Sequence, residues 1–101
     1  NFLKLRAKAE RLIHQVDYLD ERLQIVDHDR RGLYIQIRSL PPYKDDTQIQ
    51  FNEISLTKDK VGIKRIAFNR KDERKREVPL DLSEEVFRRL LEDVRRVFSE
   101  A

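Results

Sequence analysis

The chain has 101 residues and a formal net charge of +3, and 41% of its residues are charged against 39% that are hydrophobic. This length suits one domain, 1–101, which buries enough apolar surface to fold without a metal or a disulfide. Because Cys is absent, a disulfide framework, thiol catalysis and cysteine-based zinc sites are excluded, and we expect a cytoplasmic protein. No apolar run approaches the roughly 18 residues of a membrane span, so no membrane partner is expected. The chain also lacks Met and opens directly into a helical pattern, so both a whole protein and a processed or excised piece of a longer one remain open.

The N-terminal segment has the spacing of an amphipathic helix. Apolar residues recur at alternating steps of three and four, which predicts a helix over residues 1–21. The same spacing would suit the core of a coiled coil, so self-association as a homodimer is one candidate interaction. The residues of this predicted dimer seam are Phe2, Leu5, Leu12, Val16 and Leu19.

Residues 22–26 allow two interpretations. Leu23 and Val26 continue the heptad spacing of the helix, but they also begin an alternating pattern that passes through a polar turn ending at Gly32. We favour a strand from about Leu23, because Ile13 widens the apolar stripe of the helix beyond a coiled-coil seam. The second strand of this hairpin alternates over residues 33–37, and Pro41 and Pro42 end it. Residues 41–48 are predicted to be a polar connection.

The segment from residue 49 to residue 68 carries the most specific structural pattern. With a turn centred on Lys58 and Asp59, each apolar residue of one strand lies opposite an apolar residue of the other. Apolar positions change face once in each strand, which predicts a bent or bulged hairpin whose two halves bury opposite faces. The predicted pairs are Leu56 with Val61, Ile54 with Ile63, Asn52 with Arg65, Phe51 with Ile66, Ile49 with Phe68, and Glu53 with Lys64 as a favourable charge pair.

The C-terminal part predicts a short edge strand followed by a helix. The strand ends at Val78 and Pro79, and the helix covers residues 81–100 with a wide apolar stripe. Its N-cap is either Asp81, in a capping box with Glu84, or Ser83. The predicted fold class is therefore α+β: an N-terminal amphipathic helix, a bent, meander-like antiparallel sheet of about five strands over residues 22–79, and a C-terminal helix packed on the sheet.

The chain has no recognisable catalytic constellation. With two Gly and no Cys, phosphate-cradling loops and nucleophile elbows are excluded. His28 stands between Asp27 and Asp29, but on a strand it points away from both of them, so we expect a polar turn rather than a metal site. Asp45 and Asp46 have no partner at a defined spacing. We predict a protein that is not an enzyme and has no cofactor, metal or small-molecule ligand.

Positive charge is concentrated in residues 58–76, which carry nine basic and three acidic groups. Several of these basic groups could follow a phosphate backbone or an acidic protein. The other interpretation is a solvated edge that resists aggregation. The candidate polyanion-binding residues are Lys64, Arg65, Arg70, Lys71, Arg74, Lys75 and Arg76.

Two function classes remain open. The first is a non-catalytic interaction or assembly module that acts through its N-terminal helix and its edge strands. The second is a nucleic-acid-binding protein that uses the basic hairpin and loop over residues 58–76. Over about residues 22–100, the order of strands followed by a packed helix resembles that of single-strand-binding modules such as the PUR-repeat and Whirly families. The resemblance lies in element order rather than in a residue motif, and it implies nucleic-acid binding.

Overall fold

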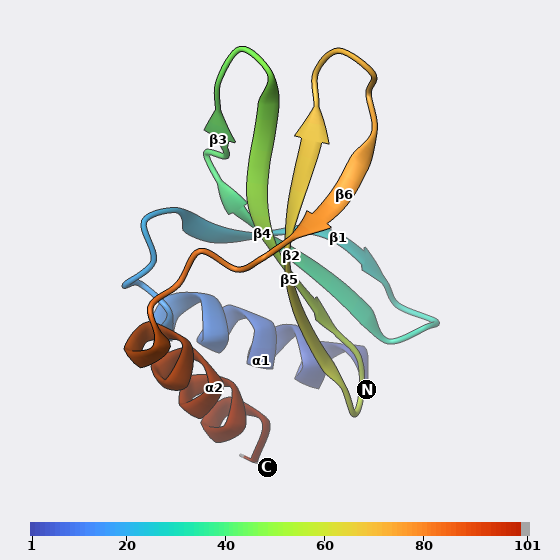
Figure 1. The fold of residues 1–101 in the computed structure, drawn as a ribbon. Helices are drawn as coiled ribbons and strands as arrows, with labels where there is room; N and C mark the ends of the chain where they lie inside the picture. The colour runs from blue at the N-terminus through green and yellow to red at the C-terminus, as the bar shows by residue number, and fades with distance from the viewer. Residues whose placement is uncertain (100–101) are drawn as a thin grey trace.

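The computed structural model describes residues 1–99, which form an α+β fold of two helices and an antiparallel sheet of six strands (Figure 1). The predicted fold class is confirmed. In chain order the elements are α1 (Phe2–Gln15), β1 (Arg22–Asp29), β2 (Tyr34–Leu40), β3 (Tyr43–Lys44), β4 (Gln48–Leu56), β5 (Val61–Asn69), β6 (Lys75–Val78) and α2 (Glu84–Ser99).

The two long central strands, β4 and β5, connect two halves of the sheet that have different neighbours. In the half that lies near the two helices, the proximal half, β2 pairs with the end of β4 over residues 53–56, and β1 pairs with β2. In the distal half, β3 pairs with the start of β4 and β6 pairs with β5 over residues 65–68. Figure 1 shows both helices at the proximal half, while the β3–β4 and β5–β6 hairpins extend away from them. Neither α1 nor α2 therefore lies over the distal half.

The register predicted for β4 and β5 is confirmed at every predicted pair, from Ile49 opposite Phe68 to Leu56 opposite Val61. The ladder is continuous, so the buried face changes without a bulge between these strands. The bulge lies instead in the β1–β2 pair, between Ile25 and Asp27. Alternation along β4 places Ile54 on the side that faces the helices and Phe51 on the opposite, open side.

The main core lies between the helices and the proximal half of the sheet. α1 packs against β1 and β2, and α2 lies beside α1. Because their buried residues form one cluster, a cavity in any of these elements would affect all of them. The cluster contains Phe2, Leu5, Ala9, Leu12, Val16, Leu23, Ile35, Ile37, Ile54, Leu56, Leu90 and Val97.

The residues predicted as a dimer seam lie in the core of their own chain. Phe2, Leu5, Leu12 and Val16 are each at most 8% exposed, and Leu19 is half-buried against the same cluster. A second copy could reach these side chains only if the core opened. Self-association through this seam would therefore require these side chains to leave the core of their own chain.

The first helix is shorter than predicted, because it ends at Gln15 rather than at residue 21. Val16 has the non-helical dihedrals φ −90° and ψ 74°, and its side chain is buried in the core. Two residues later, the Tyr18 hydroxyl donates a 2.6 Å hydrogen bond to Asp93 Oδ2 on α2. Burial and the Asp93 carboxylate raise the pKa of Tyr18, whose ring lies 3.9 Å from the Arg89 guanidinium. These contacts direct the chain toward α2, so the helix ends instead of following the heptad spacing.

The starts of β1 and α2 decide between alternatives that the sequence left open. The strand alternative for residues 22–26 is confirmed, since β1 begins at Arg22. Of the two predicted caps, the structure selects Ser83, whose Oγ accepts the Val86 N–H at 3.1 Å. Residue 100, the predicted last residue of this helix, lies outside the described residues. The two-residue strand β3 falls in a segment that was predicted to be a connection.

Candidate polyanion-binding surface

The fold divides the basic stretch over residues 58–76 between two ends of the sheet. Lys58 and Lys60 occupy the β4–β5 turn, which lies at the proximal end beside α1 (Figure 1). Residues 70–76 lie at the distal end, on the β5–β6 turn and on β6. These two groups cannot contact the same short ligand, so of the two only residues 70–76 can contribute to a binding surface at the distal end.

Arg65 is buried and does not belong to an exposed surface. It is only 7% exposed. Its Nε donates to Gln50 Oε1 at 2.9 Å and its Nη1 donates to Asn52 Oδ1 at 2.9 Å. Its Nη2 lies 3.4 Å from Glu21 Oε2. The guanidinium therefore joins β4, β5 and the segment before β1, and we exclude Arg65 from the polyanion-binding set.

The contacts of Arg65 belong to a polar layer at the junction of the two halves of the sheet. Ser39, which is fully buried, donates from Oγ to Glu21 Oε1 and accepts the Asn52 N–H at 2.7 Å. Each of these polar groups has a partner, as burial away from water requires.

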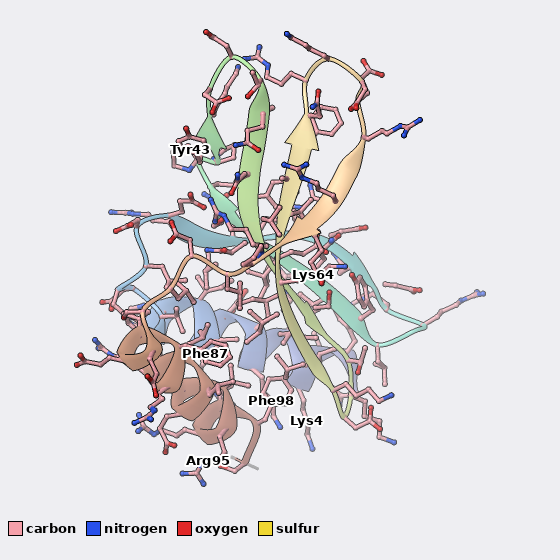
Figure 2. The ribbon with its side chains drawn as sticks, in the orientation of Figure 1. Lys4, Tyr43, Lys64, Phe87, Arg95 and Phe98 are labelled. Atoms are coloured by element: carbon pink, nitrogen blue, oxygen red, sulfur yellow. The ribbon has the colours of Figure 1, made fainter. Side chains whose placement is uncertain are left out.

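Lys64 lies on the open side of the sheet and shares an acidic partner. Its Nζ is 3.6 Å from Glu53 Oε1, which confirms the predicted charge pair. Glu53 also accepts Arg38 Nε at 3.4 Å, and the Arg38 guanidinium lies 4.6 Å from the centroid of the Phe51 ring. The cationic groups thus cover the apolar side chains of this face, and part of their charge is neutralised. Figure 2 shows Lys64 near the centre of the molecule, at the crossing of the strands.

The other predicted residues, Arg70, Lys71, Arg74, Lys75 and Arg76, are all exposed at the distal end. Arg70 ties the two distal hairpins together, because its Nη1 donates to the Asp45 carbonyl at 2.8 Å and its N–H donates to the Thr47 carbonyl at 2.9 Å. Within residues 1–99, the other four basic side chains form no salt bridge. They are the cations that remain available to a ligand.

A cross-strand row on the helix-facing side joins the two hairpins. Register places Tyr43 opposite Gln50, Gln50 opposite Ala67, and Ala67 opposite Arg76. Tyr43 is 48% exposed at one end of the row. Ala67 is almost fully buried and contributes to a hollow whose other lining residues are Thr47, Gln48, Asn69, Asp72, Arg74, Lys75 and Arg76. We define the distal surface as Tyr43, Gln48, Gln50, Asn69, Arg74 and Arg76.

Asp45 organises the β3–β4 turn at the edge of this surface. Its Oδ1 accepts the Thr47 and Gln48 N–H groups, each at 2.8 Å, and its Oδ2 accepts the Tyr43 hydroxyl at 3.0 Å. The Thr47 and Gln48 backbone groups, followed by the Tyr43 hydroxyl, lower the pKa of Asp45 from 3.8 to about 2. Asp45 therefore holds Tyr43 and the β3–β4 turn in place.

Acid is expected to loosen this turn. A carboxyl group with a lowered folded-state pKa stabilises the fold above its unfolded pKa, and that contribution is lost as pH falls. The turn should therefore weaken between about pH 4 and pH 2, which amide NMR of Thr47 and Gln48 would detect as lower protection from exchange, relative to the intrinsic rate at each pH, and shifted resonances. Asp45→Asn should give the loosened turn at neutral pH, whereas Asp46→Asn should not. An acid-insensitive Gln48 amide would contradict this role of Asp45.

Sequence reasoning missed the distal row because Tyr43 was assigned to an irregular connection. A two-residue strand has too few positions to show alternation, so no sequence pattern reveals it. The exposed aromatic ring and the two glutamines beside it were therefore not connected with the arginines of β6.

No protein-family model matches this sequence, and no curated protein or solved structure matches it either. Among residues 1–99, no three metal-binding side chains converge. His28 lies with its ring 5.3 Å from the Phe2 ring. None of the helices in that range is long and apolar enough to cross a membrane.

Proposed function

We propose that this protein is a non-catalytic binding module that takes a single-stranded nucleic acid across its distal surface. The observation that carries the proposal is the cross-strand row from Tyr43 to Arg76, which combines an exposed aromatic ring, the Gln50 amide and a guanidinium. A base can stack on such a ring, and amides can form hydrogen bonds with base edges. Arginines supply the phosphate contacts.

The dimensions of the distal surface favour a single strand. Three interstrand spacings separate Tyr43 from Arg76, which gives about 14 Å at about 4.8 Å each. This width accommodates a few nucleotides with their bases on the sheet and their phosphates at its basic edge. Neither α1 nor α2 projects from the distal half, so neither helix could enter the major groove of a duplex bound there.

Assembly through α1 has less support, because the residues of the predicted seam are buried in the core. An interaction module remains the general class of the proposal. Within that class, the distal surface favours a nucleic acid as the partner, because its exposed arginines form no salt bridge with other described residues.

Fluorescence anisotropy with labelled oligonucleotides of about 12 nucleotides, a length within known site sizes, would test the proposal. We expect single strands to bind more tightly than duplexes, with affinity that falls as salt is added. Arg74→Gln/Arg76→Gln should reduce the log-log salt slope by about 1.4, since each phosphate contact on a single strand contributes about 0.7. Tyr43→Leu should weaken binding by about 1 to 3 kcal/mol for the lost stack and leave the slope unchanged.

A matched control carries the same change of charge elsewhere. Arg88→Gln/Arg95→Gln removes two exposed arginines of α2, each of which pairs with a glutamate of its own helix. Binding by this control should match that of the wild type apart from a small effect of net charge. Equal losses in the two double variants, or no binding at low salt, would overturn the proposal.

A further inference from the structure

A second concave site lies at the proximal end of the molecule, opposite the distal surface. This groove, of about 390 Å³, is bounded by the first turns of α1, the last turn of α2, and the turns after β1 and β4. In Figure 2 the side chains of Lys4 from α1 and Phe98 from α2 lie close together at this end. The volume falls in the range of about 300 to 1,000 Å³ that small-molecule sites occupy.

The groove combines an apolar floor with a positively charged rim. Leu5, Leu33 and Phe98 supply apolar surface, and the first of these is buried while the other two are half-buried. Lys4 and Lys58 are exposed at the rim. None of the described residues that line the groove is acidic. The site therefore offers an anion both a charge partner and an apolar surface.

Lys8 is a third cation in the groove, and it is held in place by α2. Its Nζ lies 5.3 Å from the centroid of the Phe98 ring and donates to the Phe98 carbonyl at 3.4 Å. Lys4 and Lys58 form no salt bridge with other described residues. The first turn of α1 contains no acidic residue, so the positive end of the helix is not compensated from within. An anion bound between the lysines would compensate it.

We propose that this groove binds a single-chain amphiphilic anion, with its carboxylate between Lys4 and Lys58 and its apolar chain on Leu33 and Phe98. The arrangement favours this class over a polynucleotide, because the described residues that line the groove include no exposed aromatic ring on which a base could stack and supply an apolar floor instead. It also favours it over a neutral lipid, which would leave Lys4 and Lys58 without an anionic partner. The inference is independent of the distal surface, since the two sites share no residue.

Anilinonaphthalene sulfonate, a fluorescent aromatic anion, is a direct probe of such a site. We expect saturable fluorescence enhancement at one site per chain and displacement of the dye by decanoate. Decanol, which lacks the charge, and inorganic phosphate, which lacks the chain, should each displace it poorly. Lys4→Gln/Lys58→Gln should weaken both dye and decanoate binding by about tenfold or more, because charge-assisted contacts are lost.

Lys44→Gln/Lys71→Gln serves as the matched control, since it removes two exposed lysines at the distal end. This variant should bind the dye as the wild type does, and thermal melting should show that all variants are folded. The proposal is overturned if both double variants bind the dye equally, if decanol displaces it as well as decanoate does, or if the folded protein does not bind the dye. Nucleic-acid binding by these variants tests the distal surface alone, and a loss of it would leave the proposal for the groove unchanged.

Discussion

Replacing Arg65 with Met is expected to lower the free energy of unfolding by about 2 to 4 kcal/mol, because removal of one member of a buried ion pair leaves the other uncompensated. The guanidinium is the centre of the polar layer, with hydrogen bonds to Gln50 and Asn52 and an ion pair with Glu21. Met fills a similar volume, so the loss would come from unsatisfied polar groups rather than from a cavity. Glu21 keeps some contact with solvent, which limits the cost of leaving it unpaired.

Urea denaturation of three variants would separate these contributions. Arg65→Lys keeps the charge but loses the planar fork that reaches three acceptors, so we expect an intermediate loss. Arg65→Met with Glu21→Gln removes the uncompensated charge and should recover part of the stability lost in Arg65→Met. A loss below about 1 kcal/mol for Arg65→Met would mean that water replaces the guanidinium without cost, and the polar layer would not then be a structural element.

The β4–β5 pairing could be predicted because the apolar pattern of the two strands fits only one register. Apolar positions change parity once in each strand, and only one register pairs all of them and places Glu53 opposite Lys64. A shift by one residue would expose the apolar side chains of both halves. Local periodicity did not predict the end of α1 in the same way. The spacing continues through Leu19, whereas the break at Val16 depends on contacts with a helix more than seventy residues away in sequence.

The basic surface was predicted in part, because charge is visible in a sequence while its neighbours in space are not. Residues 58–76 form one run along the chain, yet β5 carries its two ends to opposite ends of the sheet. The pairing of Arg65 with Asn52 was predicted, but its burial could not be foreseen, since its ionic partner Glu21 comes from a distant segment. The proximal groove has the same origin: two helices and two turns supply its lining, so no single segment shows its combination of lysines and apolar residues.

Leu12→Ala is expected to destabilise the protein by about 3 to 5 kcal/mol, since deletion of a fully buried leucine side chain costs transfer free energy and leaves a cavity. Leu12 is also a member of the predicted dimer seam, so the concentration dependence of this loss distinguishes the two roles. If the side chain packs only within its own chain, the loss should be the same at low and high protein concentration. A stability loss that changes with concentration would place Leu12 in contact with a second copy.

Leu3→Ala provides the control for the same helix. Leu3 is 67% exposed and faces away from the core, so its truncation should change the free energy of unfolding by no more than about 0.5 kcal/mol. Urea denaturation followed by circular dichroism would measure both variants. A large effect of Leu3→Ala with a small effect of Leu12→Ala would mean that the helix buries the opposite face in solution. The core described here would then be wrong at α1, and self-association through the helix would again be the better account of its apolar stripe.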